Sequence, residues 1–266
     1  MTVKRYDGGD GVDATRKIPE ETPVSLSYNG IAHAVMMATP EDFKDFALGF
    51  SLSERIIKTP EEIENISVVD DKKGVIVNVT IPEERHIELI KRRRGMTGWT
   101  GCGLCGVESL EDAVPELPAP VKDNLRIAPQ AVYSAFDNLH PHQPEKQATG
   151  AVHAAAWCHP DGGIIIVRED VGRHNALDKL IGAMHLKEMD FQDGFCLITS
   201  RCSYEMLQKT AQAGIPLLAA ISAPTALAVE MAETAGVTLI ALARKENFTV
   251  FTHGHRITED EQGEKQ

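Results

Sequence analysis

The sequence predicts an α/β protein in two parts, a smaller α+β part followed by a sheet that helices cover. Beyond residue 148, short apolar runs alternate with segments of helical spacing, an order typical of a sheet with helices packed on its faces. Before that point, apolar runs come in pairs joined by turns, which favours antiparallel hairpins. With 266 residues, the chain is long enough for one large domain or two modest ones.

The composition is that of an ordinary globular protein with an acidic surface. Hydrophobic residues make up 42% of the chain and the formal net charge is −12, so the surface as a whole does not favour nucleic acid or anionic membranes. An anionic ligand therefore needs a local basic site. No apolar run approaches the length of a membrane span, and residues 1–17 lack the apolar core of a signal peptide. We expect a soluble, cytoplasmic protein without a nucleic-acid or membrane partner.

The first part of the chain is predicted to begin with a flexible tail and to continue as strands and helices. Residues 1–20 are polar with mixed charge, which favours a loose tail. Residues 22–39 indicate two strands around a type I′ turn at Asn29-Gly30. Thr39 is expected to cap a helix with Pro40 at its first position. This part is completed by a hairpin over 66–70 and 74–81 and a helix over 83–94.

The second part is predicted to alternate strands and helices after a linker. Residues 108–125 are rich in proline and indicate the linker, and the branched run 162–169 predicts a buried strand. The other segments are predicted as helices over 128–140, 173–187, 204–214 and 225–236, a turn over 141–147, and strands over 195–200, 215–222, 237–243 and 248–252. The resulting division is a tail over 1–20, a smaller N-terminal domain over 21–115, a linker and helix over 116–148, an α/β domain over 149–256 and a polar tail over 257–266.

Cys102 and Cys105 form a closely spaced cysteine pair in a glycine-rich stretch. The basic run 91–94 lies just upstream, and cationic neighbours favour the reactive thiolate form. A structural zinc site normally needs four ligands, and the other three cysteines form no second pair. We therefore favour a sulfur-carrying nucleophile, while a redox dithiol stays open. The odd total of five cysteines argues against a secreted disulfide framework.

A polar cluster lies where the strand over 162–169 gives way to a helix. Eight of the twelve residues from 168 to 179 are polar or charged, more than helix capping needs. In an open α/β sheet, ligands lie outside the carboxyl ends of strands, and a helix N-terminus favours an anion. The structural alternative is a capping and salt-bridge cluster. The candidate ligand-binding residues here are Arg168, Asp170, Arg173 and His174.

Two further strand ends carry polar residues. Ser200 and Arg201 follow the strand over 195–200, where a hydroxyl and a guanidinium can bind a phosphate, although capping by Ser203 is a simpler alternative. Arg244 and Lys245 follow the strand over 237–243 and by themselves indicate only a charged turn. His153 is more typical of a hydrogen-bonded core histidine than of a ligand. His253 and His255 lack other nearby metal ligands in the sequence, so no metal site is predicted.

Several long motifs together resemble the FdhD/NarQ family of formate dehydrogenase accessory proteins, a sulfur carrier family. The resemblance covers residues 20 to 256, and the motifs occur in the family's order. It is far more specific than the cysteine pair alone. The matching stretches are residues 28–54, 92–110, 149–157, 169–182, 200–209 and 222–233.

The resemblance implies a function in molybdenum cofactor maturation. Family members accept sulfur as a persulfide from a cysteine desulfurase and pass it to the bis(molybdopterin guanine dinucleotide) form of the cofactor, before its insertion into formate dehydrogenase. Cys102 matches the persulfide-carrying cysteine and Cys105 its partner. The family's cofactor-binding segment matches Leu242, Ala243, Arg244, Lys245, Glu246 and Asn247, and GDP is expected to act as a ligand analogue.

The resemblance also implies a fold and an assembly. The second domain is expected to be a three-layer α/β/α arrangement similar to that of cytidine deaminases, beside a smaller α+β domain, and the protein is expected to be a homodimer. Zinc deamination is rejected, because no glutamate stands two residues after His153 and no later Pro-Cys-x-x-Cys occurs. Two departures are Cys202, where relatives often have alanine, and the segment 243–247, which lacks a glycine that many relatives carry.

Two other functions are compatible with the motifs. A delivery chaperone would bind the cofactor and use its cysteines only to sense redox state. A dithiol oxidoreductase would form a reversible Cys102–Cys105 disulfide and have no affinity for nucleotides. The basic run 91–94 and the polar strand ends favour a nucleotide ligand over the second of these.

Overall fold

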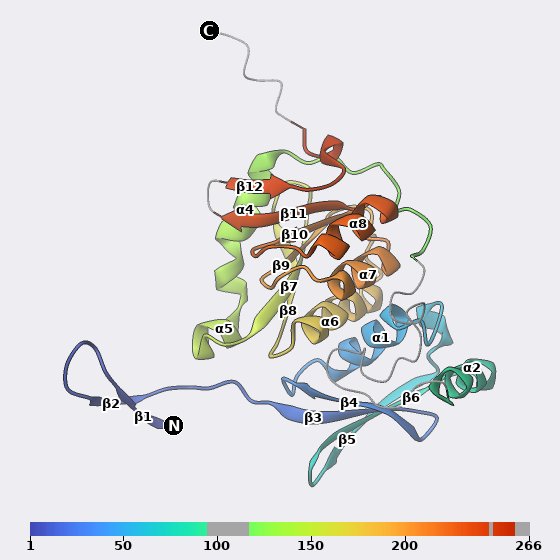
Figure 1. The fold of residues 1–266 in the computed structure, drawn as a ribbon. Helices are drawn as coiled ribbons and strands as arrows, with labels where there is room; N and C mark the ends of the chain where they lie inside the picture. Colours follow the sequence, from blue (N-terminus) through green and yellow to red (C-terminus); the bar gives the residue numbers. More distant parts are fainter. Residues whose placement is uncertain (95–116, 245–246, 259–266) are drawn as a thin grey trace.

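The computed structural model describes residues 1–94, 117–244 and 247–258, which form two domains and an extended N-terminal arm (Figure 1). The larger domain contains a six-stranded sheet of order β12-β11-β10-β9-β7-β8, and the smaller one contains a four-stranded sheet of order β4-β3-β6-β5. Residues 1–20, predicted as a loose tail, contain the two-stranded hairpin β1 (Thr2–Arg5) and β2 (Val12–Thr15).

The N-terminal domain is built from the two predicted hairpins and two helices. Asn29 and Gly30 have φ angles of 49° and 80°, as the predicted type I′ turn requires. Val24, Leu26 and Val77 point from the sheet into a core that α1 covers. The elements are β3 (Thr22–Tyr28), β4 (Ile31–Ala38), α1 (Phe43–Ser53), η1 (Pro60–Glu62), β5 (Asn65–Asp71), β6 (Gly74–Thr80) and α2 (Glu83–Arg94).

The prediction that Thr39 caps the first helix is wrong, because α1 begins at Phe43 with Asp42 as its N-cap. The Thr39 hydroxyl instead accepts a hydrogen bond from the backbone N–H of Val171, at 3.1 Å, in the other domain. Asp42 has a φ of 55°, so the backbone turns sharply just before the helix. A tertiary contact therefore displaces a locally favourable cap by three residues.

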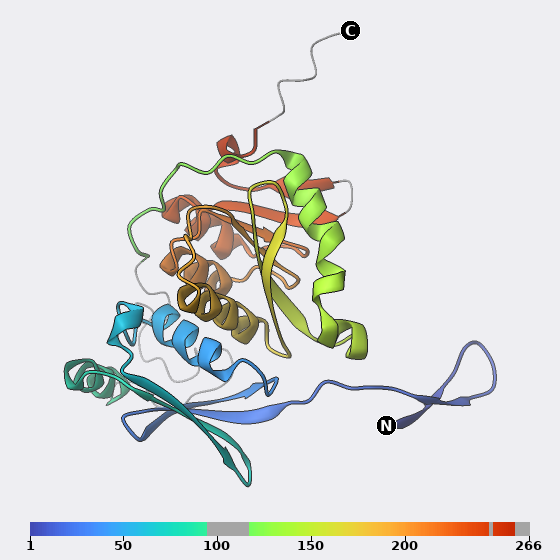
Figure 2. The ribbon, with the colours of Figure 1, turned by 180° about the vertical axis from the view of Figure 1, so that it is seen from behind.

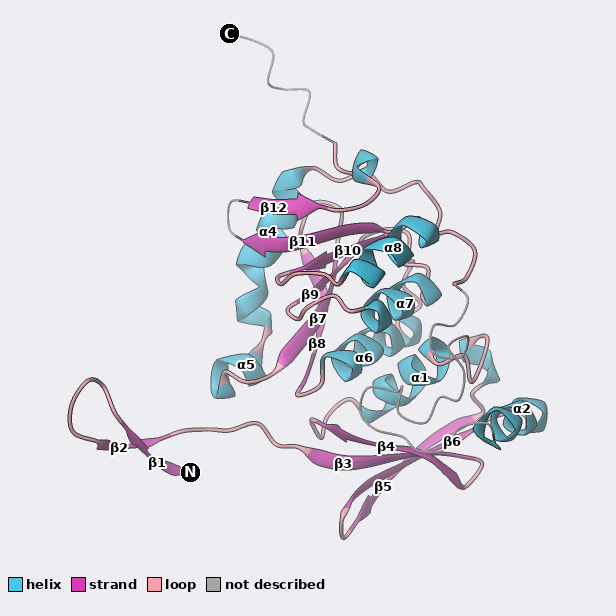
Figure 3. Cartoon of the chain, viewed as in Figure 1, coloured by secondary structure: helices cyan, strands magenta, loops and turns pink. Residues whose placement is uncertain are grey.

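The C-terminal domain confirms the predicted three layers (Figures 2 and 3). Helices α6, α7 and α8 share one buried core with one face of the sheet, and α4 shares another with the opposite face. Its elements are α4 (Pro129–Leu139), η2 (His140–His142), α5 (Pro144–Thr149), β7 (His153–Cys158), β8 (Ile164–Asp170), α6 (Arg173–Leu186), β9 (Phe195–Ile198), α7 (Tyr204–Gln212), β10 (Leu217–Ala220), α8 (Ala226–Ala235), β11 (Thr238–Arg244), β12 (Asn247–Val250) and η3 (Gly254–Arg256).

Three segments of this domain differ from the sequence prediction. No element was predicted for the small apolar stretch 149–158, which contains β7, an interior strand that lies between β9 and β8. Its run of alanines has little strand propensity, and sheet pairing on both sides overrides it. The turn predicted over 141–147 contains part of the short helix α5. The polar tail predicted from residue 257 begins with a sheet-like contact, because Thr258 donates a backbone hydrogen bond to Ile127.

Among the described residues, no helix is long and apolar enough to cross a bilayer.

The two domains meet where α1 crosses α6 (Figure 1). A Cβ atom on Gly182 would lie 1.9 Å from the carbonyl oxygen of Asp45, and one on Gly49 would lie 1.7 Å from that of Asp178. Both distances are far below van der Waals contact, so the helix backbones approach closely only because both residues are glycine. The crossing places the N-terminal domain directly against the helix that follows β8.

Replacing Gly182 with alanine should therefore destabilise the protein. In an exposed helix the change would stabilise by about 1 kcal/mol through helix propensity. Here overpacking reverses the sign, and we expect a loss of about 1–3 kcal/mol of unfolding free energy in urea. Gly9→Ala is the matched control, because a Cβ there meets no atom within 4 Å. A stabilised Gly182→Ala protein would contradict this account of the crossing.

Candidate functional site

The predicted ligand-binding segments meet at the end of the six-stranded sheet where four parallel strands terminate, called the carboxyl edge. Strands β8, β9, β10 and β11 run in the same direction, so their carboxyl ends share this edge. Arg173, Ser200 and Arg244 each follow or end one of these strands. Because β8 and β11 are four strand spacings apart, the carboxyl ends of these two strands are separated by about 19 Å. The arrangement suits an elongated ligand that lies along the edge.

Asp170 lies at this edge but is fully buried and is surrounded by partners from the protein. Its carboxylate lies 2.8 Å from the Lys179 ammonium, and neither side chain is exposed. The second oxygen accepts hydrogen bonds from the Asn175 amide at 3.0 Å and the Gly172 backbone at 2.8 Å. The backbone N–H of Thr39 donates to the first oxygen at 3.0 Å. These contacts give Asp170 a structural role at the domain interface.

Arg168 also binds the N-terminal domain. Its guanidinium lies 2.6 Å from the Asp45 carboxylate and 3.3 Å from that of Asp42, at the start of α1. For Arg168 and Asp170, the contacts agree with the salt-bridge alternative in the sequence analysis.

A second buried ion pair joins the domains further along α6. Lys209 donates to Asp178, Glu54 and the Ser53 hydroxyl, at 2.8–3.0 Å. Burial opposes the charge on Lys209, but the two carboxylates outweigh it and raise the pKa of the ammonium. Lys179, which belongs to the polar cluster of the sequence, and Lys209, which no motif singled out, therefore each place a buried cation at this interface.

Arg173 and His174 stand in the first turn of α6 and face the first turn of α7. The His174 ring lies 3.1 Å from the Glu205 carboxylate, which also accepts a hydrogen bond from Ser203. Burial alone would raise the pKa of Glu205, but the hydrogen bond from His174 and the charges of His174 and Arg173 hold it below its usual range. The Nε atom of Arg173 is buried and has no hydrogen-bond partner among the described residues.

His153 stands opposite Asp170 at the start of β7 and adds a second imidazole to this corner of the site. Partial burial, and then the charges of Arg173, Lys146 and His174, lower its pKa. The imidazole is therefore neutral at pH 7. His153 and Glu205 are site-lining residues that the sequence analysis did not select, since a lone histidine and a helix-start glutamate are usually structural.

Ser200 and Arg201 occupy the end of β9. Ser200 is buried and donates its hydroxyl to the carbonyl of Arg201 at 3.0 Å, whereas the Arg201 side chain is exposed. Ser203 is the N-cap of α7, but its hydroxyl binds Glu205 and not the backbone. Of the two predicted residues, Arg201 is the one whose side chain is accessible to a ligand.

The segment 242–247 lies at the far end of the same edge, where β11 turns into β12. Leu242 is exposed and has a φ of 56°, at a bulge in the pairing of the two strands. Ala243 is buried, and Arg244 pairs with Asn247 across the hairpin with both side chains exposed. Lys245 and Glu246 lie outside the described residues. The left-handed backbone at Leu242 is of the kind that glycine adopts most readily.

Cys102 and Cys105 lie outside the described residues, but the chain on either side of them is placed. Arg92 donates to the backbone carbonyls of Glu54 and Arg55, at the end of α1. After the gap, Val121 donates to the carbonyl of Ala235, the last residue of α8. Both anchoring points lie at the carboxyl ends of helices, whereas the candidate ligand edge adjoins the amino ends of α6 and α7.

The three described cysteines are buried inside the C-terminal domain. Burial raises the pKa of the Cys158 and Cys202 thiols to about 12 and also raises that of Cys196. These thiols are protonated at neutral pH and are poor nucleophiles. Cys202, one of the two departures from the family pattern, is thus a core residue.

Histidines near the C-terminus are bound to other side chains and to the backbone. His255 lies 2.8 Å from the Asp123 carboxylate, and the His253 ring lies 3.0 Å from the Glu233 carbonyl. Within the described ranges, no group of three or more His, Cys, Asp or Glu residues could hold a metal ion.

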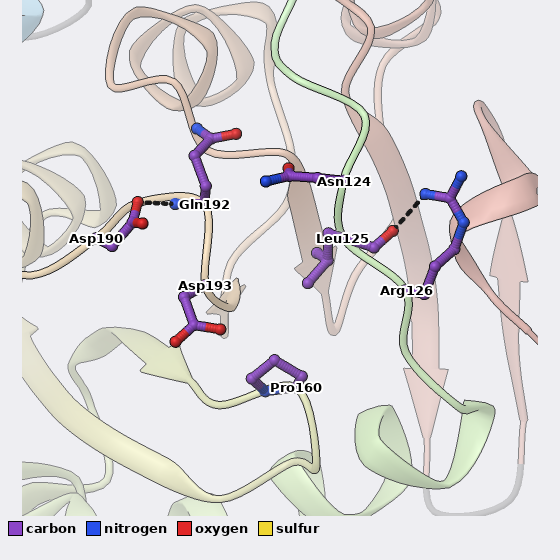
Figure 4. A pocket seen from close by; sticks show the side chains of 7 residues that line it. All are labelled: Asn124, Leu125, Arg126, Pro160, Asp190, Gln192 and Asp193. Carbon is purple, nitrogen blue, oxygen red and sulfur yellow. Dashed lines mark hydrogen bonds between the residues drawn. The ribbon is translucent and has the colours of Figure 1, made fainter.

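Two hollows in the described part of the surface lie away from the candidate edge. One of about 340 Å³ lies at the opposite, amino edge of the sheet, between Arg126, Pro160 and the loop from Asp190 to Asp193 (Figure 4). In it, the Asp190 carboxylate accepts a hydrogen bond from the backbone N–H of Gln192. Another of about 260 Å³ lies beside Lys58, His185 and Lys209 at the domain interface.

Comparison with known proteins decides the family. The model of the FdhD/NarQ family matches residues 19–258, nearly the whole chain. The chain belongs to the FdhD/NarQ family. A sulfur carrier protein FdhD from Xanthomonas campestris pv. campestris (strain B100) is 50% identical over 256 residues, which are 96% of this chain and 91% of that protein. One from Cupriavidus necator is 48% identical over 257 residues, 97% and 89% of the two chains.

A solved structure supports the fold of this family member. A protein from Desulfotalea psychrophila, assigned as a formate dehydrogenase accessory protein, superposes with a TM-score of 0.76 over 97% of this chain and 98% of its own. At 23% sequence identity, this likeness concerns the fold alone. It spans both domains of the FdhD/NarQ chain, so their combination is common to the two proteins.

Proposed function

We propose that this chain is a sulfur carrier for formate dehydrogenase. It takes sulfur from the persulfide of a cysteine desulfurase and passes it to the molybdenum cofactor, in its bis(molybdopterin guanine dinucleotide) form, before insertion into the enzyme. The observation that carries the proposal is the 48–50% identity, across almost the whole chain, to proteins named sulfur carrier protein FdhD. The donor, the cofactor substrate and a cytoplasmic homodimeric state are part of the proposal.

The sulfur step is assigned to Cys102. Its thiolate attacks the outer sulfur of the donor persulfide, the sulfur–sulfur bond of the donor breaks, and the desulfurase cysteine leaves as a thiolate. Cys102 then holds the sulfur as a persulfide, which Cys105 stabilises or resolves as a disulfide. Cys158, Cys196 and Cys202 are excluded from this role by their burial and by their raised pKa values.

The cofactor step is assigned to the carboxyl edge of the six-stranded sheet. A chain with a net charge of −12 needs local positive charge to hold phosphates, and Arg173, Arg201 and Arg244 supply it along this edge. His174 adds a ring nitrogen beside Arg173. Arg168, Asp170 and Ser200 support the edge through their contacts with the protein.

Sulfur loading tests the proposal directly. The purified chain is incubated with a cysteine desulfurase and cysteine, and its intact mass is measured. A gain of about 32 Da that a reductant removes is expected for a persulfide. No added sulfur, in a protein that still binds GDP, would contradict the sulfur carrier and favour the delivery chaperone. A reversible disulfide without GDP binding would favour the dithiol oxidoreductase.

Replacing Arg173 with alanine should weaken GDP binding. Hydrogen bonds to charged groups are worth about 1.5–3 kcal/mol, so the Kd measured by calorimetry should rise about 10- to 100-fold. Arg126→Ala is the matched control, because Arg126 lines the hollow at the opposite edge of the sheet. Equal losses in both variants, or no loss in either, would contradict the assignment of the phosphates to the carboxyl edge.

A further inference from the structure

Two carboxylates at the end of β8 have both of their oxygens bound by the protein. The oxygens of Asp170 accept hydrogen bonds from backbone and side-chain donors. Those of Glu169 accept them from two backbone N–H groups at the start of α5, at 2.8 and 2.9 Å. These two carboxylates are therefore part of the protein's own framework.

Glu205, in the first turn of α7, differs from them. Helix α7 lies beside α6 (Figure 1), and the Oε2 atom of Glu205 lies 3.1 Å from Nε2 of His174 and 3.3 Å from the Ser203 hydroxyl. The Oε1 atom accepts no hydrogen bond from any described residue and is accessible to solvent. Burial opposes the charge, but the hydrogen bond from His174 and the nearby cations hold the pKa of Glu205 below its usual range, so the group is ionised at neutral pH. Glu205 therefore presents a charged acceptor oxygen at the carboxyl edge.

A carboxylate at this position does not suit a site that has only phosphates to bind. Negative charges repel each other, and the repulsion grows as a ligand displaces water from the surface. Glu205 also partly neutralises the positive charges of Arg173 and His174. The carboxylate favours only a ligand group that brings N–H donors, because hydrogen bonds to a charged acceptor are among the strong ones. A ligand without such donors leaves the oxygen desolvated and unpaired, so Glu205 discriminates between ligands.

On the basis of the proposed function, we propose that Glu205 recognises the ring edge that guanine and pterins share, an amino group and a ring N–H beside a carbonyl oxygen. The Oε1 atom can accept both N–H groups, since a carboxylate oxygen accepts two hydrogen bonds. The neighbouring carbonyl oxygen of the ring then meets the positive charge of Arg173 and His174, which act on Glu205. Adenine has an unprotonated ring nitrogen in place of the N–H and would set its lone pair against the carboxylate. Arg201 and Arg244, further along the edge and exposed, remain for the phosphates.

The test measures the Kd by calorimetry for GDP, ADP and neopterin, a pterin without phosphate groups. The wild type should prefer GDP to ADP. In Glu205→Gln the Kd for GDP should rise about 10- to 100-fold, because a neutral amide replaces the charged acceptor, whereas the Kd for ADP should stay equal or fall. Glu188→Gln, just beyond the other end of α6, removes the same charge from an exposed side chain and should change neither value. Inosine diphosphate, which lacks the amino group of guanine, should bind the wild type about 10-fold more weakly than GDP, and this difference needs no variant.

The pattern of losses in Glu205→Gln identifies the ring. A loss for GDP assigns the contact to guanine, and a loss for neopterin alone assigns it to a pterin. Equal changes for GDP and ADP, or no change for GDP and neopterin, would overturn the proposal and leave Glu205 as a support for His174, while the proposed cofactor site would stand. A wild type that binds none of these ligands would overturn the proposed cofactor site and this inference together. Circular dichroism checks that each variant is folded.

Discussion

Replacing Cys102 with alanine should abolish sulfur loading and formate dehydrogenase activation, while the Kd for GDP stays within about twofold of the wild-type value. The two functions are expected to separate because the persulfide is carried by one sulfur atom, whereas the nucleotide is held by side chains along the sheet edge. Intact mass after incubation with a desulfurase gives the first readout, and calorimetry with GDP gives the second. Equal loss of both in a folded variant would contradict this division of roles.

Cys202→Ala is the matched control for this experiment. Cys202 is buried and its thiol has a pKa of about 12, so its removal should leave sulfur loading unchanged. Cys105→Ala completes the set. If Cys105 resolves or stabilises the persulfide, this variant should still gain sulfur but lose it faster than the wild type. A variant without Cys102 that still loads sulfur would move the carrier role to Cys105.

Replacing Lys179 with methionine should strongly destabilise the protein. Methionine fills the space of the lysine side chain up to Cε but lacks the ammonium, so the Asp170 carboxylate stays fully buried without its cation. Breaking a buried pair in this way costs about 3–5 kcal/mol. We expect the urea midpoint to fall accordingly, with a further effect on the contact with Thr39, whose carbonyl also accepts a hydrogen bond from Lys179.

A double substitution distinguishes the loss of the ion pair itself from the cost of leaving one charge buried without a partner. Lys179→Met together with Asp170→Asn removes both charges but keeps an acceptor oxygen for the Thr39, Gly172 and Asn175 donors, and replacing a buried ion pair by uncharged groups is often close to neutral. The double variant should therefore be more stable than Lys179→Met alone. Arg5→Ala is the surface control, since the Arg5–Asp7 pair is mostly exposed and such pairs are worth about 0–1 kcal/mol. A Lys179→Met protein as stable as the Arg5→Ala protein would contradict a structural role for this ion pair.

Local sequence patterns were sufficient for most of the elements and for the layout of the second domain. Glycine after asparagine predicted the turn at Asn29-Gly30, and alternating apolar runs predicted the layered sheet, because backbone geometry and burial periodicity act over a few residues. The long motifs identified the family. The same patterns missed β7, because its alanines have no strand propensity of their own, and they misplaced the start of α1, because Thr39 binds the other domain.

Long-range contacts decide which polar residues face a ligand and which hold the domains together. From the sequence, Arg168, Asp170, Arg173 and His174 form one cluster, but in the fold the first two bind α1, α6 and the segment around Thr39, while the last two face α7. Glu205 and His153 join the site from segments about thirty residues or less away in sequence. Their roles depend on desolvation and on charges brought close by packing, and no local pattern carries that information.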